Sequence, residues 1–145
     1  MVKKLLQPAP LPAPVSAGLL ALRIAAGLAF VLHGWGKIQH PFSWMGPNSD
    51  YPAFLLGLAA LSEFGGGIAW VLGLLTPLAC FGIACTMLVA LRLHIFVMHD
   101  PFVATAPKQS SFEIAAVYLA VAVLLALAGP GRFSVDRCVF GQKTP

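Results

Sequence analysis

Four long apolar runs, each broken by very few charges, dominate the pattern of hydrophobic and polar positions along the chain. The hydrocarbon core of a bilayer is about 30 Å thick, and a helix of about 20 apolar residues spans it. A helix on the surface of a soluble domain would keep one polar face, which these runs lack. The pattern therefore predicts an all-α, four-transmembrane-helix bundle with helices at about residues 16–35, 53–75, 78–98 and 111–128.

The segments outside these runs are predicted to be short extensions of the membrane domain. Residues 1–15 carry alternating prolines, which favour an extended arm over a regular helix. Gly129, Pro130 and Gly131 end the last run and begin a polar tail at residues 130–145. We expect one membrane domain at residues 16–129, with an N-terminal arm and a C-terminal tail.

Composition supports a membrane domain. The 145 residues are 59% hydrophobic with a mean hydropathy of +0.85, and only 10% are charged, against about 25% in an ordinary soluble domain. The net charge of +4 predicts no nucleic-acid partner, because basic residues at the ends of membrane spans account for it. The three cysteines form no CxxC pair, which argues against dithiol exchange and a structural zinc site.

The basic residues predict the orientation. An even number of spans places both termini on one side, and basic residues gather near the termini. They are Lys3, Lys4, Arg132, Arg137 and Lys143. The positive-inside rule then predicts cytoplasmic termini. We expect a multi-pass protein of the inner membrane.

Glu63 is the single charged residue of the second run, and Gly65, Gly66 and Gly67 follow it. A carboxylate inside a bilayer is costly unless it is paired, hydrogen-bonded or protonated. Arg23 is the charge in the first run, and counting from Trp35 and Pro52 puts both groups about 16 to 18 Å below the outer surface. We therefore expect an Arg23–Glu63 ion pair, either as a structural salt bridge or as part of a site.

One face of the first helix gathers polar and small residues. At helical spacing this stripe holds Arg23, Gly27, Phe30, Gly34 and Lys37. Small residues let transmembrane helices approach closely, as the glycines after Glu63 also would. We expect this stripe to face another helix.

The remaining ionisable groups fall in the outer third of the bundle, which predicts a polar cavity open to that side. Arg23 and Glu63 would form its floor and, with His94, are the candidate catalytic residues. The candidate cofactor-binding residues are His33, Lys37, Arg92, His99 and Glu113. The alternatives are interfacial histidines bonded to water or headgroups, surface lysines, and a Glu113 that interacts with the helix dipole. The sequence contains no pair of histidines four residues apart, the spacing that would indicate a metal site on a helix.

Taken together, these residues resemble the DoxX family of small four-helix membrane proteins. The matching features run from residue 16 to 137: Arg23, His33-Gly34-x-x-Lys37, Glu63 with its glycines, the Gly73 to Thr76 turn, a late histidine in the third span, Glu113, and Gly129-Pro130-Gly131-Arg132-Phe133-Ser134-Val135-Asp136. The family takes its name from a subunit associated with a quinol-oxidising or thiosulfate:quinone oxidoreductase system. The resemblance implies a quinone-linked or redox-complex membrane subunit, with quinone as the cofactor.

Three functions remain open. The bundle could bind quinone, with a histidine and a carboxylate bonded to its oxygens, and act as an oxidoreductase together with a partner subunit, because the chain has no haem, flavin or iron–sulfur motif. It could instead be a non-catalytic anchor or assembly subunit for a soluble or periplasmic enzyme, with a homo-oligomer left open. A carrier would need a polar path through the cytoplasmic half, where the sequence offers almost no polar residue.

Overall fold

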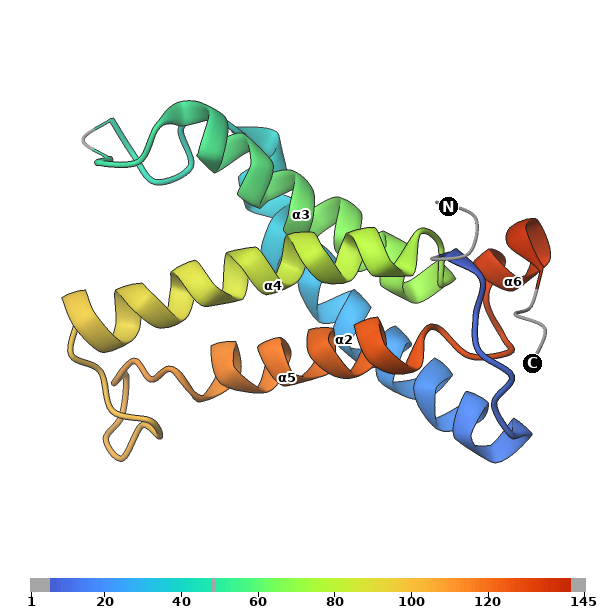
Figure 1. Ribbon diagram of the computed structural model, residues 1–145. Helices are drawn as coiled ribbons and strands as arrows, with labels where there is room; N and C mark the ends of the chain where they lie inside the picture. Colours follow the sequence, from blue (N-terminus) through green and yellow to red (C-terminus); the bar gives the residue numbers. More distant parts are fainter. Residues whose placement is uncertain (1–5, 48, 142–145) are drawn as a thin grey trace.

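The computed structural model describes residues 6–47 and 49–141, and within them it contains helices and no strand. The elements are α2 (Ala13–Gln39), α3 (Ala53–Leu72), α4 (Thr76–Arg92), the π-helical turn η1 (Leu93–Val97), α5 (Glu113–Ala128) and α6 (Val135–Phe140) (Figure 1). The predicted all-α membrane bundle is confirmed. Lys3, Lys4 and Lys143, used above for the orientation, lie outside the described residues.

Three of these elements are long and apolar enough to cross a bilayer: α2, α3, and α4 continued by η1. The fourth, α5, is apolar but has only 16 residues, or about 24 Å at about 1.5 Å per residue. It is somewhat shorter than the hydrocarbon core of a typical bilayer. The fourth predicted helix is therefore present as a shorter apolar helix beside three full-length candidates.

The helix ends differ from the predicted ends where the sequence signal is local and weak. Helix α2 begins at Ala13 because Pro14 lies in its first turn, where a missing backbone N–H breaks no helical bond. It runs on to Gln39, past Gly34 and Gly36. The short helix α6 was not predicted, although Ser134 accepts a bond from the Arg137 backbone N–H as its N-cap.

The helices pack in chain order as antiparallel neighbours, α2 on α3, α3 on α4 and α4 on α5. In Figure 1, α2 passes behind α4 and α5 at a steep angle. The α3–α4 turn is tight, with Gly73 at φ 66° and Leu75 at φ 47°, and it joins the two helices as a hairpin. The two ends of the described chain meet, since Gln7 Nε2 donates to the Phe140 carbonyl at 3.0 Å. Which side of the membrane they face stays a prediction.

The predicted stripe on the first helix is confirmed as the face that packs on α3. Arg23, Gly27, Phe30 and Gly34 are all buried. A Cβ on Gly27 would lie 2.7 Å from the Gly67 carbonyl oxygen, so only a glycine allows this approach. Phe30 also packs edge-on against Trp70, with ring centroids 5.5 Å apart. This close packing fixes the register between α2 and α3 and so the position of every charge on them.

Candidate functional site

Glu63 pairs with Lys37, not with Arg23. The Lys37 Nζ atom lies 2.6 Å from Glu63 Oε1, and the two side chains are 26% and 5% exposed. The same ammonium lies 4.4 Å from the centroid of the Trp44 ring, whose Nε1 donates to the Leu56 carbonyl at 3.0 Å. The expected Arg23–Glu63 ion pair is therefore wrong.

The register of the two helices explains the error. The backbone of Gly34 packs against Phe64, whereas Arg23 lies beside Gly73, about ten residues further along α3. The depth estimate took Trp35 and Pro52 as level with each other. In the structure the loop after α2 folds back along α3, with Phe42 against Gly57, so α3 begins well beyond the end of α2.

Arg23 is fully buried at the other end of the bundle, and its guanidinium donates to backbone carbonyls. Its Nε donates to Trp70 O at 3.0 Å, and Nη2 donates to Phe133 O at 2.9 Å and Val71 O at 3.4 Å. Nη1 donates to the Pro130 carbonyl. The planar guanidinium thereby links the end of α3 to the C-terminal tail.

Asp136 completes this arrangement from the tail. Its carboxylate accepts from the backbone N–H groups of Leu75 at 2.7 Å and Thr76 at 2.9 Å, at the N-terminus of α4. Its own N–H donates to the Gly73 carbonyl at 2.9 Å. A Cβ on Gly73 would lie 2.7 Å from Arg23 Nη1, so a glycine is needed there. We call Arg23, Gly73 and residues 129–136 the tail clamp.

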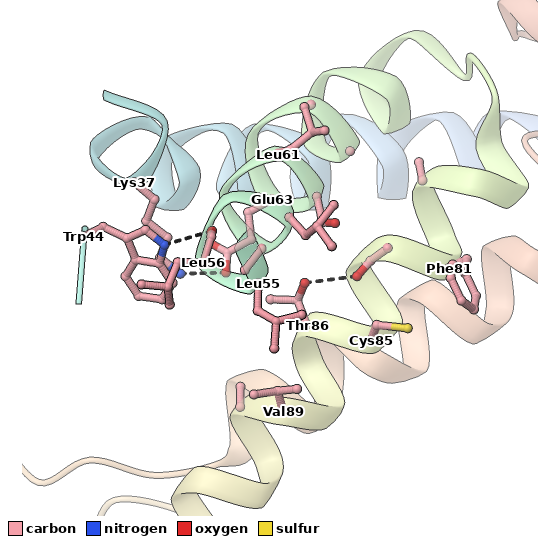
Figure 2. A pocket seen from close by; sticks show the side chains of 18 of the residues that line it. Lys37, Trp44, Leu55, Leu56, Leu61, Glu63, Phe81, Cys85, Thr86 and Val89 are labelled. Atoms are coloured by element: carbon pink, nitrogen blue, oxygen red, sulfur yellow. Dashed lines mark hydrogen bonds and ion pairs between the residues drawn. The ribbon is translucent and has the colours of Figure 1, made fainter. Parts of the chain in front are cut away.

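A groove of about 690 Å³ runs between α3 and α4 (Figure 2). Large apolar side chains that line it, among them Leu58, Leu61, Phe81 and Val89, are exposed on the outside of the bundle. The groove therefore opens on the lipid-facing surface. Its polar end is drawn in Figure 2 around Lys37, Trp44 and Glu63, and Tyr51 also lines the groove. We call it the α3–α4 groove.

Glu63 has one oxygen without a partner at this polar end. Lys37 occupies Oε1, whereas Oε2 is buried and makes no hydrogen bond. A buried acceptor left without a donor costs about 1–3 kcal/mol. The α3–α4 groove thus contains a charged group with hydrogen-bonding capacity to spare.

The other predicted site residues lie elsewhere. Of the eight predicted site residues, Lys37 and Glu63 line the α3–α4 groove and the other six do not. The structure therefore does not gather the eight residues around one cavity. Arg23 belongs to the tail clamp. The side chains outside both places are exposed or half-buried: His33, Arg92, His94, His99 and Glu113. Their roles in catalysis or binding stay predictions.

His94 belongs to a second cluster of polar side chains, at the junction of η1 and the loop that follows it. Its Nδ1 lies 2.6 Å from Asp100 Oδ2, and Ser110 Oγ donates to Asp100 Oδ1 at 2.6 Å. These hydrogen bonds, Ser110 first and then His94, hold the pKa of the Asp100 carboxyl below its usual value. Among the described residues, no three His, Cys, Asp or Glu side chains are grouped closely enough to hold a metal ion.

Two parts of these sites were missed from the sequence. Trp44 and Tyr51 were not among the predicted site residues, although both line the groove. Asp136 received no role, although Ser134 two residues before it is a typical N-cap. In both cases the partner lies on another helix, which periodicity along one run does not reveal.

Comparison with known proteins identifies the family. The DoxX family model matches residues 18–100. The inner membrane protein YqjF of Escherichia coli is 36% identical over 130 residues, which cover 83% of this chain and 90% of that protein. An uncharacterized protein of Haemophilus influenzae is 30% identical over 121 residues, or 82% of this chain and 88% of the relative.

A search of the solved structures found no match. The Escherichia coli relative is an inner membrane protein, and the apolar helices fit a multi-pass protein, so the predicted inner-membrane localisation is confirmed. The chain belongs to the DoxX family.

Proposed function

We propose that this chain is a quinone-binding membrane subunit of a redox system and that the α3–α4 groove is its binding site. A lipid-soluble quinone combines a flat polar headgroup with a long apolar tail. The DoxX resemblance points to a quinone, and the groove offers a place of matching character. The observation that carries the proposal is one long apolar groove with all its ionic residues, Lys37 and Glu63, at one end.

The polar end suits a flat headgroup. The Lys37 ammonium has three N–H donors, and Glu63 takes one of them, so others are free for a ligand oxygen. Trp44 and Tyr51 supply aromatic faces on which a planar ring can stack. Trp44 is held in place by its bond to the Leu56 carbonyl, so its ring is positioned before a ligand arrives.

The apolar part of the groove suits the tail. Leu55, Leu58 and Leu61 of α3 face Phe81 and Val89 of α4 along it. A tail can enter from the bilayer, because the same side chains are largely exposed on the outside of the bundle. Electron transfer falls to a partner protein, which makes this chain the subunit that presents quinone from the membrane.

Gly65 provides the test, because it lines the groove and a Cβ there meets only the tip of Leu61 at 3.4 Å. The change Gly65→Leu should fill the groove without disturbing the fold. Wild-type protein purified in mild detergent is extracted with organic solvent, and quinone is quantified per protein. We expect bound quinone in the wild type and a loss of at least about tenfold in Gly65→Leu.

Gly18→Leu is the matched control, because Gly18 lies on α2, outside the groove, and a Cβ there would meet no atom of a neighbouring element within 4 Å. It should retain the wild-type amount of quinone. Equal quinone in both variants would contradict the groove as the site. A wild-type protein that carries a stoichiometric redox partner and no quinone would instead support the anchor function.

A further inference from the structure

The Glu63 carboxylate gives the α3–α4 groove a preference for ligands that donate a hydrogen bond. The shape of the groove alone does not provide this preference. Glu63 is 4% exposed, and Lys37 occupies only one of its oxygens. The other oxygen, Oε2, is buried without a partner. An ionised carboxylate accepts hydrogen bonds and donates none. The group that best completes this site is therefore a ligand O–H or N–H.

We propose that Glu63 makes the groove selective for the dihydroxy form of the ligand, a quinol, over the dicarbonyl form, a quinone. This inference rests on the proposed function, since it concerns the redox form that the same groove prefers. A quinol hydroxyl donates to Glu63 and its oxygen accepts from Lys37. A quinone carbonyl only accepts, so it can bond with Lys37 but meets the carboxylate oxygen as a second acceptor.

A small movement gives the ligand access to the carboxylate. Oε2 has almost no exposed area in the structure, so a ligand reaches it only if the carboxylate moves. The terminal torsion of a glutamate is soft and roughly two-fold. A partial rotation about this bond can bring Oε2 towards a hydroxyl in the groove while Oε1 stays within reach of Lys37.

The expected size of the preference follows from one additional bond. A hydrogen bond to a charged group is worth more than one between neutral groups, and this one also satisfies a buried acceptor. We expect the quinol to bind at least about tenfold more tightly than the quinone.

The experiment measures both redox forms on the same protein. Full-length protein in lipid nanodiscs is equilibrated without oxygen with decylubiquinol or decylubiquinone, and bound ligand is separated by ultrafiltration and quantified. Protein-free nanodiscs correct for partition into lipid. The expected result is a wild-type quinol preference of at least about tenfold that falls close to one in Glu63→Gln, whose amide can donate to a carbonyl.

Asp50→Asn is the matched control, because Asp50 is an exposed carboxylate in the loop before α3 that does not line the groove. It should keep the wild-type preference. If Glu63→Gln does not fold with Lys37 unpaired, the double variant Lys37→Met/Glu63→Gln removes both charges and should also show no quinol preference.

The outcomes separate the inference from the proposed function. Equal wild-type affinity for the two forms, or a preference that survives in the folded Glu63 variants, would overturn the selectivity and leave quinone binding intact. Binding of neither form above the level of protein-free nanodiscs would overturn the proposed function itself.

Discussion

The two ends of the bundle bury charge in opposite ways. At the end where the described chain begins and finishes, Arg23 donates to four backbone carbonyls and Asp136 accepts from two backbone N–H groups. At the other end, Glu63 has one bonded oxygen and one without a partner. Both ends match the DoxX resemblance, but only the second lies beside a groove.

The comparison teaches that a buried charge in a membrane helix is not by itself evidence of a site. A charge whose hydrogen-bonding capacity is fully used by backbone holds the chain together, as in the tail clamp. A charge with capacity left over, next to space that a ligand can enter, is a candidate for binding. The difference can be tested by changing one charge at each end.

The largest effect is expected from Arg23→Met. This change keeps much of the side-chain volume but removes the guanidinium, so buried carbonyls of α3 and the tail lose their charged donor. We expect a loss of about 3 to 5 kcal/mol in the free energy of unfolding. Thermal unfolding followed by circular dichroism in one detergent measures it.

Arg92→Met is the control for this prediction, since Arg92 is exposed and should change stability little. The quinone content of the Arg23→Met protein that remains folded should equal that of the wild type. A stable Arg23→Met protein that has lost its quinone would reverse the roles assigned to the two ends.

A smaller effect is expected from Lys37→Met, at the end of the bundle that holds Glu63. Glu63 then has no charged partner, but the effect is limited because Lys37 was partly exposed from the start. We expect a loss of about 1 to 3 kcal/mol, part of which the additional change Glu63→Gln restores. The same unfolding experiment completes the double-mutant cycle.

Lys108→Met, in the exposed loop before α5, controls for the loss of a positive charge. If the effects of Lys37→Met and Glu63→Gln simply add, the 2.6 Å ion pair contributes nothing to stability. The Lys37–Glu63 pair would then behave like an ion pair on the surface of the protein, not like one in its core.

The fold was predictable because its signals are local. Apolar runs predict helices in a bilayer, and the spacing of Arg23, Gly27, Phe30 and Gly34 predicts a common face whatever that face meets. The structure confirms the bundle and the face. The helix ends shifted by a few residues at most positions, and the short helix α6 was not predicted.

The partners of the charges were not predictable, because they depend on the register between helices. Phe42, in the loop after α2, packs against Gly57 of α3, which fits a register that sets Glu63 level with Lys37 and Arg23 level with Gly73. Asp136 caps α4 from 60 residues away in the chain. The spacing of residues along one apolar run does not show the register between helices. The lysine and the glutamate of the polar end had, however, been predicted as site residues from the sequence alone.

The smallest effect is expected at Asp100, which lies at the same end as Glu63 but has both oxygens bonded. Hydrogen bonds from Ser110 and His94 lower the pKa of this carboxyl. Because the folded-state pKa lies below the unfolded value of about 3.9, the carboxylate stabilises the loop above that pH. The contribution is lost as the pH falls through the lowered pKa. Titration of ¹³C-labelled aspartate by NMR measures it, with Asp100→Asn to assign the signal.

Ser110→Ala removes the hydrogen bond with the largest influence on Asp100, so the pKa of Asp100 should rise towards about 3.9. Ser111→Ala, one residue further along, should leave it unchanged, because Ser110 is the serine bonded to Asp100 in the described chain. An Asp100 that titrates at or above its usual value in the wild type would mean that its bonds are not kept in solution. The contrast between a fully bonded carboxylate and Glu63 at the same end would then no longer distinguish a structural acid from a binding one.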